Sequence, residues 1–204
     1  MRPILFLLPA LALFAQTHKA ASPAAANFKV AGSPTAPLTL EVYADYECPH
    51  CMHFYQDVVP LVIDQYVKTG KVRLVHRDFP LQGHQYARIA AKYANAAGQL
   101  GMYDVVVNQI FKTQGEWSQN GNIDGEVAKV VPPGTMQKIR ELVKSDTHLD
   151  DTVNADMAQG TSDRLNQTPT LVIVNNKTGN RQKIDGPLPF GILKSYLDQL
   201  LAKG

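Results

Sequence analysis

Two strand-like segments with one helical segment between them constrain the fold of this chain more than any other feature. Residues 37–46, PLTLEVYADY, and residues 71–79, KVRLVHRDF, are rich in β-branched, aromatic and aliphatic residues, a composition that predicts strands. Apolar residues at helical spacing predict a helix over residues 49–68, kinked at Pro60. A strand, a helix and a second strand in this order favour parallel pairing through a right-handed crossover.

The middle of the chain is predicted to be helical, and its end returns to strands. Apolar stripes predict helices within residues 81–160, interrupted by a loop at residues 115–122, GEWSQNGN. Residues 170–174, TLVIV, predict a short buried strand, and residues 181–185, RQKID, can pair back on it as a hairpin. A last amphipathic helix covers residues 192–201. The sequence therefore predicts an α/β sheet domain with an inserted helical block.

The N-terminus has the layout of a secretory signal. Residues 4–15, ILFLLPALALFA, form an apolar run that is too short to span a bilayer comfortably and is followed by a polar, Ala-rich stretch. We place the signal peptide over residues 1–20 and leave the cleavage site open between Ala15 and Ala26. Whether the signal is cleaved or retained as an anchor is also left open.

The composition excludes several classes of function. The chain has 204 residues, of which 45% are hydrophobic, enough for a sizeable core and against intrinsic disorder. The formal net charge is +2, and removal of the signal would leave 18 basic against 18 acidic residues. A nearly neutral mature chain gives no reason to expect nucleic acid or an anionic membrane surface as a partner.

Residues 21–36, rich in Ala, Ser and Pro, are predicted to be a linker.

The only two cysteines of the chain, Cys48 and Cys51, lie in the segment YECPHC. Proline is favoured at the first position of a helix, so Pro49 places Cys48 at the N-cap and Cys51 one turn into the helix. Side chains three residues apart on a helix have Cβ atoms about 5–6 Å apart. A small adjustment closes this to disulfide distance, so the pair can open and close with little backbone movement.

The start of a helix also favours the reactive thiolate form of Cys48. The dipole of the helix contributes about 1–2 kcal/mol, which lowers a thiol pKa by about one unit. Strongly oxidising enzymes have thiols with a pKa near 3.5, about five units below the ordinary value. Backbone N–H groups and a neighbouring donor must therefore supply the rest, and His50 is the candidate. A stabilised thiolate favours the reduced pair and makes the disulfide the stronger oxidant.

Three uses of the cysteine pair are open on the residues alone. A structural disulfide at this spacing closes a very small loop and constrains the unfolded chain little. A copper or zinc site needs two further ligands, for which His50 and His53 lie near and His76 and His84 elsewhere. A redox-active pair fits the helix start, the strand-helix-strand context and the predicted export best. Outside this pair, His53, His76 and His84 are expected to be surface or structural residues.

The sequence resembles the exported DsbA-type thiol:disulfide oxidoreductases of bacteria. The resemblance is carried by DYECPHC after a strand, by VRLVHRDFPL, and by TPT before a buried strand, and it runs from about residue 26 to the C-terminus. It implies a thioredoxin-like fold formed by residues 37–80 and 161–204, with an inserted helical subdomain over residues 81–160. It implies no cofactor and no metal.

The resemblance also implies a role for each residue of the cysteine motif. Cys48 would be the exposed nucleophile, which forms a mixed disulfide with a substrate protein. Cys51 would be the buried resolving cysteine of a redox-active Cys48–Cys51 disulfide. Pro49 and His50 would tune the thiolate.

A second segment is implied to face the cysteine pair. Thr168 and Pro169 match the cis-proline loop of the family, where the backbone of Thr168 would pair with a bound extended chain. Backbone pairing reads no side chains, so it suits a broad range of substrate proteins.

The chain departs from the family at one acidic position. Many members carry an acidic residue six positions before the first cysteine, and this chain has Val42 there, with Glu41 one step earlier. Because side chains alternate along a strand, Glu41 should point to the opposite face. Asp45 and Glu47 lie nearer to the cysteines, and the sequence leaves open whether Glu41 or Glu47 acts as a proton acceptor.

Together these features predict an exported, periplasmic oxidase that donates the Cys48–Cys51 disulfide to cysteines of reduced or unfolded exported proteins. By resemblance, a membrane quinone-linked thiol oxidase would regenerate the disulfide. The protein is predicted to be a monomer that binds no nucleic acid. A disulfide reductase or isomerase on the same fold, and a copper- or zinc-binding protein that uses the CPHC cysteines, are the alternatives.

Overall fold

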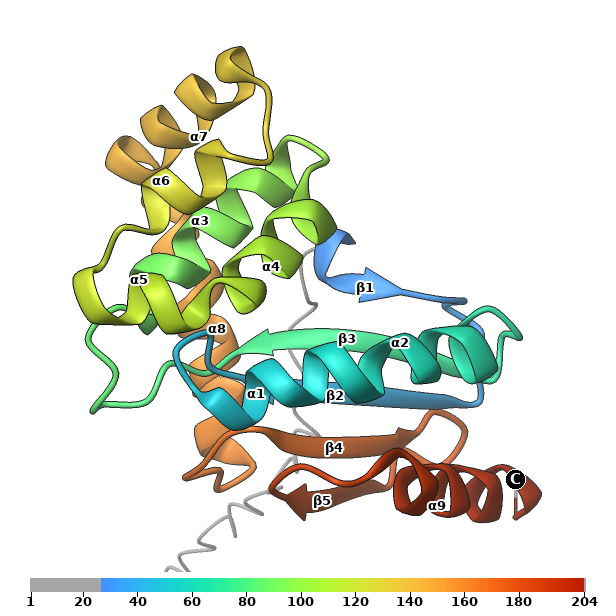
Figure 1. Cartoon of the computed structure of the whole chain (residues 1–204). Coiled ribbons are helices and arrows are strands. Elements are labelled where there is room, and N and C mark those ends of the chain that lie inside the picture. The colour runs from blue at the N-terminus through green and yellow to red at the C-terminus, as the bar shows by residue number, and fades with distance from the viewer. Residues whose placement is uncertain (1–26, 204) are drawn as a thin grey trace, which may run out of the picture.

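A mixed sheet of five strands, in the order β1-β3-β2-β4-β5, forms the centre of the molecule (Figure 1). The strands are β1 (Val30–Ala31), β2 (Leu38–Ala44), β3 (Val72–Asp78), β4 (Thr170–Asn175) and β5 (Arg181–Asp185). Strands β2 and β3 pair in parallel, and every other pair in the sheet is antiparallel. The predicted strand-helix-strand unit with parallel pairing is confirmed.

The structure is a computed structural model that describes residues 27–203. The predicted signal peptide, residues 1–20, and the first part of the predicted linker lie outside the described residues. Among residues 27–203, no helix is long and apolar enough to cross a bilayer.

Strand β2 is the middle of the sheet, and all seven of its residues are buried. The predicted strand over residues 37–46 is confirmed, and its burial on both faces extends to the polar side chains of Thr39 and Glu41. Leu40, Val42 and Ala44 face the larger of two apolar clusters, while Tyr43 belongs to the smaller cluster on the other face.

The helix that follows β2 runs without a break over residues 49–67, close to the predicted residues 49–68. It consists of α1 (Pro49–His53), the π-helical turn η2 (Phe54–Val58), α2 (Val59–Val62) and a second π-helical turn, η3 (Ile63–Val67). Pro60 lacks a backbone N–H and cannot complete the ordinary helical hydrogen bonds. The turn of wider helix before it is a known way of accommodating such an interruption.

Helices between β3 and β4 form the inserted helical subdomain, most of which lies on the β1 and β3 side of the sheet, while its last helix packs against β3 (Figure 1). They are α3 (Ala87–Gln99), α4 (Tyr103–Lys112), α5 (Gln114–Asn120), α6 (Ile123–Ala128), α7 (Pro133–Ser145) and α8 (His148–Ser162). The thioredoxin-like fold with a helical insertion is therefore confirmed.

One element of this subdomain differs from the prediction. Residues 115–122 were predicted to be a loop, but α5 covers most of them. Trp117 is fully buried, and its indole N–H donates to the carbonyl of Ile110 at 2.7 Å. This packing stabilises a helix that the polar local sequence does not predict, and Gly121 ends it with a φ of 73°.

Helix α9 (Phe190–Ala202) packs on the same face of the sheet as the 49–67 helix. Its Leu193 and Leu197 belong to the larger apolar cluster. The hydroxyl of Tyr66 in η3 donates to Asp198 of α9 at 2.6 Å, which joins the two helices directly. The last helix is confirmed.

The residues before β2 are part of the fold, in contrast to the predicted linker. Residues 27–29 form a short 3-10 helix, η1, and β1 pairs with β3 at the edge of the sheet. The ring of Phe28 lies so close to Gly98 of α3 that any side chain there would collide with it. Tertiary contacts thus order a segment whose small residues suggested none.

A buried charge network explains why this N-terminal segment is held. The Lys29 ammonium lies fully buried between Asp78 and Asp156 and donates to Asp156 at 2.8 Å. Arg77 continues the network, donating to Asp156 at 2.9 Å and to Glu41 at 2.7 Å. One network therefore connects η1, both central strands and α8.

Replacement of Lys29 by methionine should destabilise the protein strongly. Buried Asp78 would lose its ammonium partner and Asp156 one of its two cations, and breaking a buried pair in this way costs about 3–5 kcal/mol. The matched control is Lys68→Met, because Lys68 is 67% exposed in a surface pair with Asp64 that is worth less than about 0.5 kcal/mol. Urea unfolding of both variants measures the difference. Equal unfolding free energies would contradict a stabilising role for Lys29.

Candidate active site

Cys48 is the N-cap of α1, as the sequence predicts. Its backbone is extended, with φ −79° and ψ 120°, and Pro49 occupies the first helical position. The loop 45–48 joins the end of β2 to this helix. Because β2 is the fully buried central strand, the site rests on the most enclosed part of the sheet.

Both cysteines are free thiols in the structure, and both are covered. Cys51 is fully buried, as predicted, and Cys48 retains only 5% of its surface. Cys48 was expected to be exposed, and this expectation is wrong for the dithiol. The reason is the Thr168–Pro169 loop, because the Cys48 thiol donates to the Thr168 carbonyl at 3.4 Å.

The Cys48 thiol is unusually acidic, with its pKa lowered from 9.0 to about 5. The hydrogen bond from the Cys51 thiol is the largest cause, and burial of the sulfur opposes it. The Thr168 side chain and the backbone N–H groups of Cys51 and His50 lower the pKa further. A pKa of about 5 favours the thiolate form of Cys48 at neutral pH, whereas the hydrogen bond to the Thr168 carbonyl belongs to the protonated form, because only a thiol can donate it.

Cys51 behaves in the opposite way. Burial raises the pKa of the Cys51 thiol well above its ordinary value, and the hydrogen bond to Cys48 and the negative charge of Cys48 raise it further. The Asp45 backbone N–H donates to the Cys51 sulfur at 3.4 Å. In the reduced pair, Cys48 therefore carries the negative charge, and Cys51 keeps its proton.

The loop before β4 brings Thr168 and Pro169 to the cysteines across more than a hundred residues of sequence. The peptide bond between Thr168 and Pro169 is cis. The Thr168 hydroxyl oxygen is buried and has no hydrogen-bond partner among the described residues. It can therefore turn its proton toward the Cys48 sulfur when that sulfur is ionised.

The four histidines near the site lie in three different environments. His50 and His53 are exposed on α1. His76 is buried, bonded to Tyr55 and, at 3.0 Å, to Asp78, so it is the structural residue that the sequence predicts. His84 is half-buried against Asp45. The imidazole of His50 is not among the main causes of the Cys48 pKa, to which His50 contributes through its backbone.

The acidic residues near the motif are all engaged. Glu41 lies on the face of β2 away from the cysteines, as predicted, and accepts hydrogen bonds from Arg77 at 2.7 Å and Arg181 at 2.6 Å. Glu47 accepts a hydrogen bond from the backbone of Tyr86 at 2.7 Å. The proposed role of Glu41 or Glu47 as a proton acceptor stays a prediction.

Two contacts that hold the loop 45–48 could not be predicted from the sequence. Gln114 of α5 is buried and donates to the carbonyls of Tyr46 at 2.7 Å and Cys48 at 3.0 Å. No local signal marks Gln114, because it stands beside a segment predicted to be a loop. The second is the bond from His84 to Asp45, because the sequence predicted His84 as a surface or structural residue and did not identify its partner.

Among residues 27–203, no group of three or more His, Cys, Asp or Glu side chains could hold a metal ion. The copper or zinc alternative stays a prediction.

Known proteins are similar to this chain over most of its length. The family model described as Thioredoxin matches residues 26–198. Disulfide bond formation protein D of Bacillus subtilis is 27% identical over 158 residues, which cover 72% of this chain and 68% of that protein. DsbA2 of Pseudomonas aeruginosa has a crystal structure that is 27% identical, with a TM-score of 0.67 over 86% of this chain and 94% of that one.

A further relative is similar over a shorter segment. The Na(+)/H(+) antiporter NhaA 1 of Salinispora arenicola is 36% identical over 88 residues, which are 43% of this chain. The chain spans only 13% of the length of that antiporter.

The acidic Cys48 predicts that the reduced protein loses stability in acid. A group with a folded pKa of about 5, below its ordinary 9.0, stabilises the folded state fully above pH 9 and loses this contribution as the pH falls to 5. Between these values the slope approaches about 1.4 kcal/mol per pH unit. Cys51 stays protonated below pH 9 in both states and adds no slope.

Urea unfolding of the reduced protein at several pH values between 5 and 8 measures this dependence. Cys48→Ser is the control, because it keeps the shape of the side chain and cannot ionise in this range. The unfolding free energy of the reduced protein should fall relative to that of the variant as the pH is lowered. Parallel pH profiles of the two proteins would rule out an ionised Cys48.

Proposed function

The chain belongs to the thioredoxin family and is a DsbA-type thiol:disulfide oxidoreductase, and on this premise we propose that it acts as an oxidase. Its Cys48–Cys51 disulfide would be donated to pairs of cysteines in exported proteins. Its substrates would be reduced or unfolded polypeptides.

The low pKa of Cys48 is the observation that supports an oxidase, in which electrons flow from substrate thiols to the Cys48–Cys51 pair. A thiolate that is stable at neutral pH stabilises the dithiol state of the pair. The disulfide is correspondingly easy to reduce, and a disulfide that is easily reduced is a strong oxidant of other thiols. A reductase needs the reverse, a dithiol that readily gives up its electrons.

The reaction proceeds by two thiol-disulfide exchanges. A substrate thiolate attacks Cys48, the less deeply buried sulfur, and displaces Cys51, which takes up a proton because burial keeps its pKa high. A second substrate thiolate then attacks the substrate sulfur of the mixed disulfide, and Cys48 leaves as a stable thiolate. Two electrons pass from the substrate thiols, which become a disulfide, to the Cys48–Cys51 pair.

Substrate binding would use the backbone beside the cysteines. An extended chain can pair with Thr168, whose carbonyl already faces the Cys48 sulfur. One turn further along the helix, a groove of about 340 Å³ is lined by Phe54 and Val58 together with residues 187–190, PLPF. Such an apolar groove suits the side chains that unfolded proteins expose.

The cellular setting is proposed from the resemblance. The oxidase would work as an exported, periplasmic monomer without a cofactor and without nucleic acid. A membrane quinone-linked thiol oxidase would take the two electrons from the reduced pair and restore the disulfide. A reductase or isomerase on the same fold is the alternative, and the redox potential separates it from the oxidase.

Equilibration of the protein with glutathione measures this potential. We expect a value near that of strongly oxidising enzymes, about −120 mV, because the thiolate stabilises the reduced pair. A value near that of thioredoxin, about −270 mV, would contradict the oxidase. Cys48→Ser, which cannot form the disulfide, serves as the blank for the exchange reaction.

A further inference from the structure

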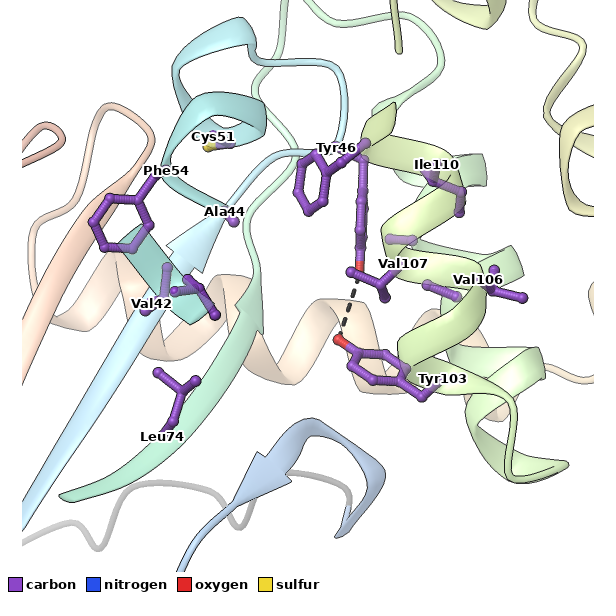
Figure 2. Close-up of a cluster of buried hydrophobic side chains, with 14 of the residues drawn as sticks. Val42, Ala44, Tyr46, Cys51, Phe54, Leu74, Tyr103, Val106, Val107 and Ile110 are labelled. Carbon is purple, nitrogen blue, oxygen red and sulfur yellow. Dashed lines mark hydrogen bonds between the residues drawn. The ribbon is translucent and has the colours of Figure 1, made fainter. Parts of the chain in front are cut away.

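We propose that a cavity between β1, β3, the 49–67 helix and α4 is a second binding site, which takes a small organic cation with an aromatic body. The volume of the cavity is about 570 Å³, within the range of about 300–1,000 Å³ that is typical of ligand pockets. Figure 2 shows two of its walls, where Leu74 of β3 lies opposite Tyr103 and Val107 of α4. The site is separate from the cysteine pair, and its ligand would take no part in thiol:disulfide exchange.

Four segments that are far apart in the sequence build the walls. Residues 28–31 of η1 and β1 form one of them, and it is held in place because the Lys29 ammonium is buried between Asp78 and Asp156. Tyr55 of the 49–67 helix stands in another wall, seven residues after Cys48 and therefore about 10 Å along the helix axis. The remaining lining residues include Val59 and Ile63 of the same helix, Leu74 and His76 of β3, and Tyr103, Asp104, Val107 and Asn108 of α4.

Aromatic rings form much of the interior. The rings of Phe28 and Tyr103 have centroids 5.3 Å apart, and the Tyr103 ring lies nearly perpendicular to that of His76 at 6.0 Å. The Tyr55 ring packs against the other side chain of this group, His76, at 5.3 Å. The faces of aromatic rings attract cations as well as other rings. An aromatic molecule that carries a positive charge therefore suits this interior better than a negatively charged one.

The polar atoms of the interior are already hydrogen-bonded within the protein. The Tyr55 hydroxyl bonds to Nδ1 of His76, and Nε2 of the same imidazole bonds to Asp78 at 3.0 Å. The Tyr103 hydroxyl bonds to that of Tyr46 at 3.3 Å. Burying an apolar body there leaves no donor or acceptor without a partner, so the interior itself requires no polar group of the ligand.

The charges on the lining leave one carboxylate without a partner. The Lys29 ammonium is neutralised by two buried carboxylates, and Lys68 pairs with Asp64 at 3.1 Å. Asp104 is exposed in the first turn of α4, and its side chain makes no ion pair or hydrogen bond among residues 27–203. Asn108, one turn further along α4, is also exposed, and its amide has no partner in the described part of the chain. The rim therefore complements a ligand whose polar end is positive and donates hydrogen bonds.

NMR titration of the isotope-labelled protein with three probes of one shape tests this site. The probes are 2-phenylethylamine, which is a cation, its neutral analogue 2-phenylethanol, and the anion 3-phenylpropionate. The amine should bind with a Kd of about 1 mM, as expected for a ligand of this size, and shift the resonances of Phe28 and Val107. The alcohol should bind about twofold to fivefold more weakly, the strength of a partly exposed charge pair, and the anion more weakly again.

The substitution Asp104→Asn separates charge from shape. It keeps the size of the side chain and removes its charge, so the amine should lose its advantage over the alcohol. Asp151→Asn is the matched control, because Asp151 is also an exposed acid in the first turn of a helix, α8, and pairs only loosely with His148 at 3.5 Å. Any effect of the charge on the helix start is then present in both variants. The control should keep the preference for the amine.

The substitution Val107→Phe tests whether the cavity holds the aromatic body. The larger side chain fills the space beside Tyr103, so none of the three probes should bind. If phenylalanine is not tolerated at this position, Ala31→Leu fills the cavity from the β1 side and provides the same test. Thermal unfolding of each variant verifies that it is folded.

Three results would overturn the proposal. One is an amine that binds no more tightly than the alcohol, and another is binding that survives in the folded cavity-filling variant. The third is a set of contacts to Phe28 from residues 1–26 or from a second copy of the chain, detected without any probe, because protein would then fill the cavity. None of these measurements involves the cysteines, so failure of the oxidase assignment is recognised separately.

Discussion

The site depends on a single sulfur that must carry a negative charge while almost covered by protein. Burial alone would keep Cys48 protonated, so the groups that donate to it decide its state. They come from separate parts of the chain: the Cys51 thiol and the backbone at the start of α1, and Thr168 before β4. The reactivity of Cys48 is therefore a property of the folded arrangement, and the CPHC motif supplies only part of it.

The rest of the fold fixes the relative positions of the groups that donate to Cys48. Strand β2 is buried on both faces and ends at the cysteine loop. Strand β4 pairs with β2 and begins beside that end, which brings Thr168 close to the cysteines. The helical subdomain contributes Gln114, which holds the carbonyls of Tyr46 and Cys48. The network around Lys29 then joins this subdomain to the sheet from the other side. The inserted helices thus do more than cover the sheet, because they fix the loop on which the thiolate forms.

Local patterns predicted the parts of this arrangement that depend on neighbours in sequence. Pro49 identified the start of the helix, and strand alternation placed Glu41 on the far face, because both follow from backbone geometry. The resemblance supplied Thr168, which no local pattern connects to Cys48. Two features escaped prediction because they depend on tertiary contacts: Trp117 orders a helix in a polar segment, and Lys29 orders what looked like a linker.

The origin of the acidity was also only partly predictable. The sequence indicated that a helix terminus could not lower the Cys48 pKa far enough, and it offered His50 as the missing contributor. The structure instead gives the largest share to the Cys51 thiol, and His50 contributes through its backbone. The sequence shows that Cys51 is one turn away, but not that its proton points at Cys48 while its own pKa is raised by burial.

The ionisation of Cys48 is the central claim, and direct titration of the thiolate tests it. The ultraviolet absorbance of thiolate, followed in the reduced protein as the pH is raised, should show one step with a midpoint at about 5. The step should be absent from Cys48→Ser. A reduced protein that shows no ionisation until about pH 8.5, the value of an ordinary cysteine, would contradict the account.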